Sequence, residues 1–202
     1  MITPNITIVI PTRSVPSLED CDTTLWSLNE QTYKRFKIII VPDQGRGANW
    51  ARNEGFHMVD TEYVLFSDND ITWAEKGLQV LVEALEENTN ASYAYGVWGD
   101  NRGELSFEEF DEDELKKRNY ISTMSLIRTA DFCGFDEDIE RLQDWDVWLT
   151  MLESNKVGVQ CGHRIFTTDT GGGITNDSKE DYTKAKKIIM DKHEIPNSST
   201  SR

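Results

Sequence analysis

Short apolar segments alternate with amphipathic segments through the first third of the chain, and this alternation limits the folds that the chain can adopt. The apolar segments have the length of strands and lie at residues 6–11, 36–41 and 62–66. The amphipathic segments carry apolar residues every three or four positions, as helices do, and begin at Ser17, near Ala48 and at Trp73. Short connections between strands and helices favour parallel strand pairing with right-handed crossovers. We therefore predict an α/β fold with a mostly parallel central sheet flanked by helices.

The second half of the chain is less regular than the first. Residues 119–128 have the pattern of a strand, a helical face follows Asp144, and residues 178–194 have the pattern of a last amphipathic helix. No linker or low-complexity segment separates the two halves. We therefore predict a single domain over residues 1–194 and a flexible tail over residues 195–202.

Charge and apolar run length exclude several classes of partner. The chain has 36 acidic and 21 basic residues and a net charge of −15, so it repels nucleic acid. Its longest strongly apolar run, residues 38–41, is far shorter than the ~20 residues of a membrane-spanning helix, and we expect no integral membrane segment. The cysteines Cys21, Cys133 and Cys161 lack the spacing of a metal site. We interpret them as reduced thiols, which predicts a cytoplasmic location.

Polar residues follow each of the three predicted strands of the first third. These residues are Thr12 and Arg13, then Asp43, then Asp68 and Asp70. Ligands of open α/β sheets bind beyond the carboxyl ends of the strands, so we expect these side chains to line one site. Asp68 and Asp70 can both offer oxygens to one Mg²⁺ or Mn²⁺ ion. The alternative is a turn in which these side chains only cap the next helix.

Other nucleotide and hydrolase motifs are missing from the sequence. There is no P-loop, no dinucleotide-binding glycine fingerprint and no nucleophile elbow. Residues 68–72 do fit the DxDx[TV] pattern of haloacid-dehalogenase-like phosphatases, in which Asp68 would be the nucleophile and Asp70 the acid/base. That pattern normally closes the first strand of its domain, whereas two predicted strands precede it here. A phosphatase is therefore the alternative rather than the preferred function.

Several segments, taken in order, resemble glycosyltransferase family 2. They are ITIVIPTR, IIIVPDQG, GANWARNEGF, YVLFSDND and FCGFDEDIERLQDWDVWLTML, which lie between residues 6 and 152. The resemblance covers roughly residues 6–166. The resemblance implies the GT-A fold, with a Rossmann-like nucleotide-binding half and a more irregular acceptor half. It implies inverting transfer of a sugar from a nucleotide diphosphate donor, with a UDP-sugar favoured, to a hydroxyl of a carbohydrate or glycolipid, using Mn²⁺ or Mg²⁺.

The same resemblance assigns residues to the nucleotide. Thr12 and Arg13 would flank it, and Asp43 would hold the base. Arg52, in the Ala-Arg-Asn-x-Gly segment, would reach the nucleotide from the second predicted helix. This chain has Pro42 and Asp43 where the family commonly has two aspartates, so the identity of the nucleotide stays open.

The resemblance also assigns the metal and the general base. Asp68 would contact the ribose or a metal-bound water, Asp70 would ligate the metal, and Asp144 would be the base. Asp144 follows Gln143 where the family has glutamate, which keeps a non-catalytic sugar-nucleotide-binding protein as a further alternative. As a helix N-cap, Asp144 would also support its own carboxylate. Asp146 points about 200° away around the same helix.

This arrangement meets the chemical needs of sugar transfer. A departing nucleotide diphosphate develops negative charge, which a divalent cation can neutralise. The acceptor hydroxyl is a poor nucleophile, so a carboxylate must take its proton on the side away from the leaving group. Two separate acidic segments in one site, 68–70 and 144–146, would satisfy both needs.

Overall fold

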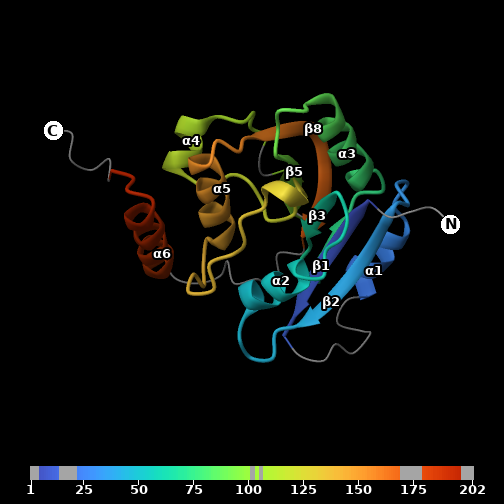
Figure 1. Cartoon of the computed structure of the whole chain (residues 1–202), viewed down its shortest axis with the longest axis horizontal. Coiled ribbons are helices and arrows are strands. Elements are labelled where there is room, and N and C mark those ends of the chain that lie inside the picture. Colours follow the sequence, from blue (N-terminus) through green and yellow to red (C-terminus); the bar gives the residue numbers. More distant parts are fainter. Residues whose placement is uncertain (1–4, 14–21, 101–102, 105–106, 169–178, 197–202) are drawn as a thin grey trace.

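A mixed β-sheet forms the centre of the molecule (Figure 1). The computed structural model describes residues 5–13, 22–100, 103–104, 107–168 and 179–196. The strands are β1 Ile6–Thr12, β2 Phe36–Pro42, β3 Tyr63–Phe66, β4 Ile71–Trp73, β5 Tyr93–Asp100, β6 Gly103–Glu104, β7 Leu126–Arg128 and β8 Gly158–Thr168. The helices are α1 Asp22–Asn29, α2 Ala48–Phe56, α3 Gly77–Glu87, α4 Glu112–Lys117, α5 Gln143–Glu153 and α6 Lys179–Lys192. The predicted α/β fold is confirmed.

The strand order β2-β1-β3-β7-β5-β8-β4 divides the sheet into two parts, with β6 beside β5. Both neighbours of β1 are parallel to it, as the alternating pattern predicts. Beyond β3 the sheet is mixed, because β7 runs antiparallel to both β3 and β5 and β4 runs antiparallel to β8. The carboxyl ends of β1, β2 and β3 therefore lie at one edge, where the polar residues of the first third follow them.

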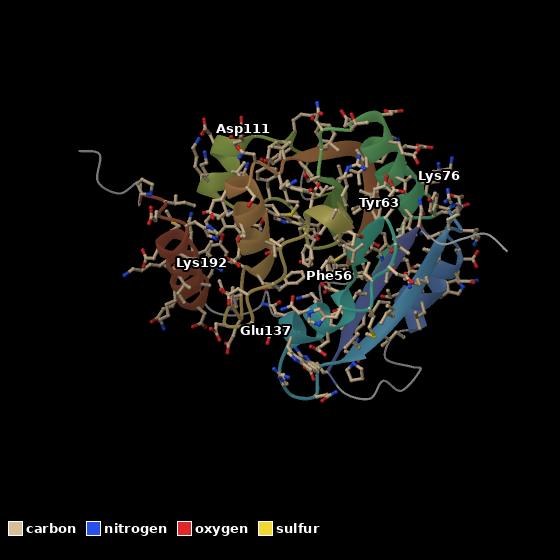
Figure 2. All side chains as sticks on the ribbon, viewed as in Figure 1. Phe56, Tyr63, Lys76, Asp111, Glu137 and Lys192 are labelled. Atoms are coloured by element: carbon tan, nitrogen blue, oxygen red, sulfur yellow. The ribbon has the colours of Figure 1, made fainter. Side chains whose placement is uncertain are left out.

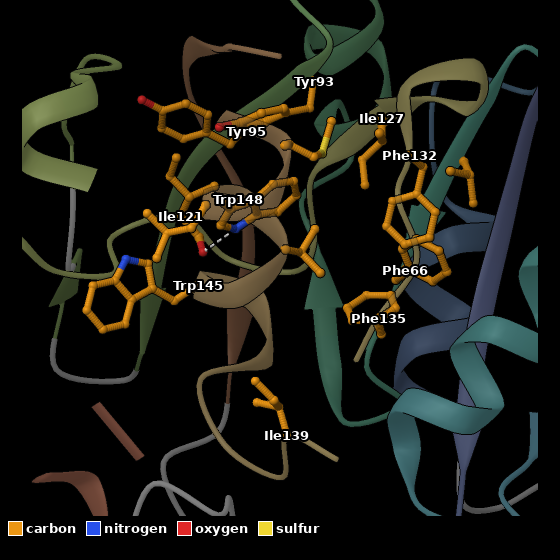
Figure 3. Close-up of a cluster of buried hydrophobic side chains, with 14 of the residues drawn as sticks. Phe66, Tyr93, Tyr95, Ile121, Ile127, Phe132, Phe135, Ile139, Trp145 and Trp148 are labelled. Atoms are coloured by element: carbon orange, nitrogen blue, oxygen red, sulfur yellow. Dashed lines mark hydrogen bonds between the residues drawn. The ribbon is translucent and has the colours of Figure 1, made fainter. Parts of the chain in front are cut away.

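Two hydrophobic cores lie on opposite faces of the sheet. Alternate residues of β1 point to opposite faces, so that Ile8 joins the core containing α1 and α3 while Val9 joins the core containing α2 and α5. In the second core Tyr93 stacks on Trp148 with ring centroids 4.4 Å apart. The indole of Trp148 donates a 3.0 Å hydrogen bond to the carbonyl of Ile121 (Figure 3), and the indole of Trp145 donates one to Leu115. These contacts hold α5 against β5, α4 and the loop between α4 and β7.

Lys76 and Asp111 extend from the ribbon toward the surface, whereas Phe56 lies inside (Figure 2). Phe56 packs edge-on against Phe132 with ring centroids 4.8 Å apart, which fixes the end of α2 to the loop before α5.

The expectation that a helix begins at Trp73 is wrong. Ile71–Trp73 is the short edge strand β4, which pairs with residues 166–168 of β8. Its other edge is covered by hydroxyls of α1: Ser27 accepts a 3.0 Å hydrogen bond from the amide of Trp73, and Thr24 bonds to both backbone groups of Ile71. Tertiary pairing thus overrides the local helical pattern, and α3 begins only at Gly77.

Two other boundary expectations have different outcomes. The strand predicted over residues 119–128 is limited to β7, because only Leu126–Arg128 find partners in β3 and β5. The helix start predicted at Ser17 lies outside the described residues, and the described helix α1 begins at Asp22.

Gly55 sets how closely α2 approaches β1. A Cβ atom at this position would lie 2.3 Å from Cγ1 of Val9. We expect Gly55→Ala to lower the free energy of unfolding by about 1–2 kcal/mol, because overpacking a core costs roughly 1–3 kcal/mol and the helix propensity of alanine returns at most about 1 kcal/mol. Urea unfolding monitored by circular dichroism would measure this. Glu54→Ala, on the neighbouring and partly exposed position, is the matched control; equal stability of both variants would contradict the prediction.

Candidate active site

The ends of β1 and β2 are joined just beyond the sheet. The amide of Asp43 donates a 2.7 Å hydrogen bond to the carbonyl of Thr12. The carboxylate of Asp43 accepts a 3.0 Å hydrogen bond from the amide of Gly45, where φ is +78°. Thr12 is buried, and Arg13 follows it at the exposed edge. The structure thus brings together the Thr12, Arg13 and Asp43 segments that the sequence predicts for the nucleotide.

Arg52 and Asp68 form the central ion pair of the site. Nη2 of Arg52 lies 2.9 Å from Oδ1 of Asp68, and Nη1 donates a 3.0 Å hydrogen bond to Oδ1 of Asn49. The guanidinium also lies over the ring of Phe135, 5.3 Å from its centroid. The Arg52 side chain is only 4% exposed, whereas that of Asp68 is 40% exposed. Arg52 is therefore buried and supports Asp68, which is the member of the pair that is accessible from solvent.

One face of α2 also carries two asparagines that hold the loop before α5. Asn49 donates hydrogen bonds of 2.9 and 2.7 Å to the carbonyls of Asp136 and Ile139. Asn53 bonds to both backbone groups of Phe135, each at 2.9 Å. Residues three and four apart share a helix face, which explains why these asparagines and Arg52 act together. Sequence reasoning gave no role to Asn49 or Asn53 individually.

Asp144 lies in the first turn of α5, near the Arg52 ion pair. Burial raises the pKa of its carboxyl group above the ordinary value, against the hydrogen bonds from Asn119 and from the amide of Trp145 and against the positive charge of Arg52. The Trp145 amide bond measures 2.9 Å. Asn119 is a site residue that the sequence analysis missed, because it lies in a segment whose pattern indicates only a strand.

Asp144 is not the N-cap of α5, contrary to expectation. The N-cap is Leu142, which has left-handed backbone angles of φ 58° and ψ 29° and makes no capping hydrogen bond through its side chain. Asp144 lies two residues further on, within the helix. Its carboxylate still lies near the positive end of the helix dipole, which favours the charged form.

Asp146 faces away from this site, as its position on the helix predicts. Its side chain is 3% exposed and lies 2.8 Å from both Nζ of Lys192 and Nε2 of His193. A carboxylate that is buried and engaged by two cationic side chains is not available to an acceptor. Of the two acidic residues of α5's first turn, Asp144 is therefore the better candidate for a base.

Asp70 lies in the turn after Asp68 and is exposed. Among the described residues no group of three or more His, Cys, Asp or Glu side chains is arranged to hold a metal ion. The carboxylates that the chain presents for a metal at this turn are those of Asp70 and of the partly exposed Asp68. This donor set fits a cation that takes its remaining oxygens from a diphosphate and water, as Mg²⁺ and Mn²⁺ do.

Comparison with known families identifies the part of the chain that carries this geometry. Residues 42–139 match the family model Glycosyl transferase family 2. This similarity to glycosyl transferase family 2 covers slightly less than half of the chain. The matched segment includes Asp43, Arg52, Asp68 and Asp70, whereas Asp144 lies just beyond it. No curated protein sequence matches the chain.

Solved structures of glycosyltransferases share the fold of this chain. TarS from S. aureus superimposes with a TM-score of 0.68 at 15% identity, over 93% of this chain and 39% of TarS. TarS residues 1–349 in complex with UDP-GlcNAc give 0.67 at 16% identity, over 91% and 65%. The mannosyltransferase PcManGT from Pyrobaculum calidifontis, in complex with GDP-Man and Mn²⁺, gives 0.64 at 12% identity, over 95% and 63%. The GT-A fold that the sequence predicts is confirmed.

The chain spans less than two thirds of the length of these structures. Within its own described residues, none of the helices combines the length and apolar character needed to cross a bilayer.

Proposed function

We propose that this chain is a metal-dependent inverting glycosyltransferase, which moves a sugar from a nucleotide diphosphate to an acceptor hydroxyl. One observation carries the proposal: Arg52 pairs with Asp68 and its charge also acts on Asp144. Asp68 and Asp144, from distant parts of the sequence, thus act on the same guanidinium. This supports Asp68 in donor and metal binding and Asp144 in proton transfer, and residues 42–139 match a family named for glycosyl transfer.

The donor would lie across the ends of β1, β2 and β3. Thr12 and Arg13 would flank the nucleotide, and the carboxylate of Asp43 would hold its base. Arg52 would act on the nucleotide through Asp68, because its own guanidinium is buried and engaged. TarS structures with UDP and UDP-GlcNAc support a UDP-sugar, and PcManGT with GDP-Man keeps a second nucleotide open.

Mn²⁺ or Mg²⁺ would be held by Asp70, with Asp68 as its second carboxylate. When bound, the cation supplies positive charge to the leaving diphosphate. The contact with Arg52 holds Oδ1 of Asp68 in place. The Asp68 carboxylate would therefore present one fixed oxygen and one exposed oxygen to the donor. The Mn²⁺ in the PcManGT structure supports this choice of ion.

Asp144 would be the general base. As the acceptor oxygen bonds to the anomeric carbon, the bond from that carbon to the diphosphate oxygen breaks and the hydroxyl proton passes to Asp144. Attack from the side opposite the leaving group inverts the configuration. Burial raises the pKa of Asp144, which makes its ionised form a stronger base. Asn119 and the Trp145 amide hold the carboxylate in place. The acceptor would be a carbohydrate or glycolipid.

The phosphatase alternative gains no support from the fold. Asp68 follows β3 rather than the first strand, and its carboxylate is already paired with Arg52.

The free thiols of Cys133 and Cys161 fit a reducing compartment such as the cytoplasm, which we propose as the location.

Calorimetry with UDP-GlcNAc and GDP-mannose, each with Mn²⁺ and with EDTA, tests the proposed function. We expect binding of at least one donor that depends on the metal, and slow release of the nucleotide diphosphate on incubation. Hydrolysis of a generic phosphate ester, without release of UDP or GDP from the sugar donors, would favour the phosphatase. Donor binding without any release would favour the non-catalytic alternative.

A further inference from the structure

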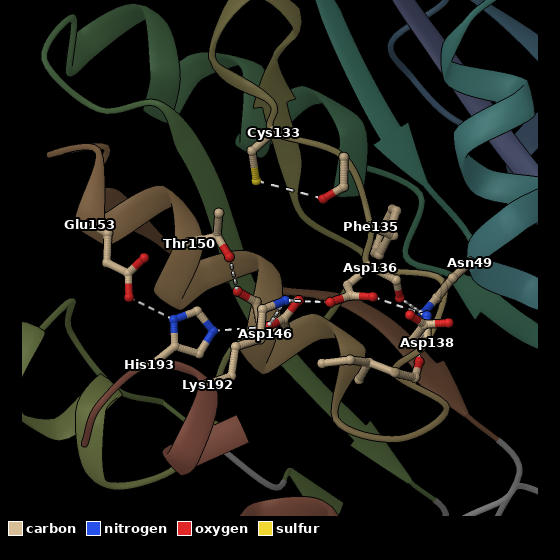
Figure 4. A network of polar contacts seen from close by, with 12 residues as sticks. Asn49, Cys133, Phe135, Asp136, Asp138, Asp146, Thr150, Glu153, Lys192 and His193 are labelled. Atoms are coloured by element: carbon tan, nitrogen blue, oxygen red, sulfur yellow. Dashed lines mark hydrogen bonds and ion pairs between the residues drawn. The ribbon is translucent and has the colours of Figure 1, made fainter. Parts of the chain in front are cut away.

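The end of α6 is fastened to α5 by a partly buried cluster of charged groups (Figure 4). Nε2 of His193 lies 2.8 Å from Oδ1 of Asp146, and Nδ1 lies 2.7 Å from the carboxylate of Glu153. Lys192 lies 2.8 Å from the same Asp146 oxygen and 3.0 Å from the other. The side chains of His193 and Asp146 are 4% and 3% exposed. Both oxygens of Asp146 are thus engaged by the last residue of α6 and the residue that follows it.

The contact lies at the first turn of α5, which has no side-chain cap. Its N-cap, Leu142, makes no side-chain capping bond. Asp146 lies in the first turn together with Asp144, and its amide donates a 3.1 Å hydrogen bond to the carbonyl of Leu142. Holding the Asp146 side chain therefore holds the turn from which Asp144 projects.

The contact also extends to the loop before α5. Lys192 lies 2.6 Å from Oδ2 of Asp136, whose carbonyl accepts the 2.9 Å hydrogen bond from Asn49 of α2. Asn49 in turn holds Arg52. Polar contacts therefore run from Lys192 through Asp136 to Asn49 of α2 (Figure 4), and from Asn49 to Arg52, the ion-pair partner of Asp68.

We propose that Lys192 and His193 are positioning residues for the base, and that docking of α6 on Asp146 fixes the orientation of Asp144 during sugar transfer. The proposal rests on the proposed function, because it takes Asp144 as the base. Neither residue touches the donor end of the sheet, so both would act on turnover rather than on donor binding.

The docking contact has a defined pH dependence. Burial lowers the pKa of His193, but hydrogen bonds and charges from Asp146 and Glu153 outweigh burial and raise it above the ordinary value. A raised histidine pKa in the folded state stabilises docking at low pH, and that stabilisation is lost as pH rises through the raised pKa. The other charged groups beside His193 are Lys192, which also contacts Asp146, and the cavity-lining residues Glu112, Lys116 and Glu194.

Lys192→Met and His193→Gln test the proposal, with Lys187→Met, an exposed lysine of the same helix, as the matched control. Hydrogen exchange measured by mass spectrometry reports on the first turn of α5 without substrate. We expect faster exchange there in both test variants and no change in the control. In transfer assays kcat should fall by about 10- to 100-fold, since a misplacement of about 1 Å can cost 10²-fold, while the Kd for UDP with Mn²⁺ stays unchanged.

Each outcome has a definite meaning. Unchanged exchange in both test variants, or faster exchange with unchanged kcat, would overturn the positioning role. A fall in UDP affinity equal to the fall in kcat would also overturn it, because it would indicate a general loss of structure. The difference in thermal stability between wild type and His193→Gln should narrow as pH rises, and a constant difference would contradict the charged state of His193. If wild type releases no nucleotide from any donor, the proposed function fails, and the exchange result shows separately whether the docking contact exists.

Discussion

Replacing Asp144 by Asn should lower the rate of sugar transfer by about 10²–10⁴-fold, the usual contribution of a positioned general base. The amide has the size of the carboxyl group but cannot accept the proton of the acceptor hydroxyl. Donor binding and stability should change little, because Asp144 is not the cap of α5 and the core contacts of Trp145 and Trp148 remain. Steady-state transfer rates and calorimetric donor affinities measure both effects.

In wild type we also expect turnover to fall with decreasing pH already above the ordinary pKa range of aspartate, because the pKa of Asp144 is raised.

Asp146→Asn is the informative comparison, because it changes the same chemical group in the same turn. Asp146→Asn should lower the free energy of unfolding, because it breaks the ion pairs with Lys192 and His193. Because the same contact is proposed to position Asp144, it should also lower turnover by about 10- to 100-fold, less than the loss of the base itself. If Asp146→Asn abolished transfer while Asp144→Asn retained full turnover, the base would be Asp146 and our assignment of Asp144 would be wrong. If neither variant lost turnover, the base would lie outside this helix.

Asp70→Ala should abolish both tight donor binding and its requirement for metal. We expect the donor affinity to fall by more than about 100-fold, because even outer-shell partners of metal ligands are worth about 10–100-fold. Calorimetry in Mn²⁺ and in EDTA measures the effect, with Asp60→Ala as the control, since Asp60 is an exposed carboxylate paired with Lys37 on the surface. Equal donor affinity of wild type in Mn²⁺ and in EDTA would contradict a metal at this position.

The strands and helices of the first third could be predicted because their patterns are local. The runs that become β1, β2 and β3 are continuous and apolar, and parallel pairing follows from the helices between them. The position of Asp43 and Asp68 at the sheet edge then follows from chain order alone. Such residues could be assigned to one site without any knowledge of side-chain contacts.

The remaining features depend on contacts between distant segments. Nothing local distinguishes the strand β4 from the start of a helix, because its partners are β8 and two hydroxyls of α1. Asn119 meets Asp144 only in the folded chain, and Lys192 and His193 reach Asp146 only because α6 packs on α5. The left-handed backbone of Leu142, which removes Asp144 from the cap, also has no sequence signal, since leucine rarely adopts it.

The shared use of Arg52 links the charge at Asp68 to Asp144. One guanidinium is the counter-ion of Asp68 and also acts on Asp144, so a change of charge at Asp68 alters the proton affinity of Asp144. A cation and a diphosphate arriving at Asp68 would therefore change the strength of the base before any acceptor binds. The acid limb of the pH profile should then differ between kcat/KM, which reports on the free protein, and kcat, which reports on the donor complex. Filling the donor site would in this way set the proton affinity of the group that activates the acceptor.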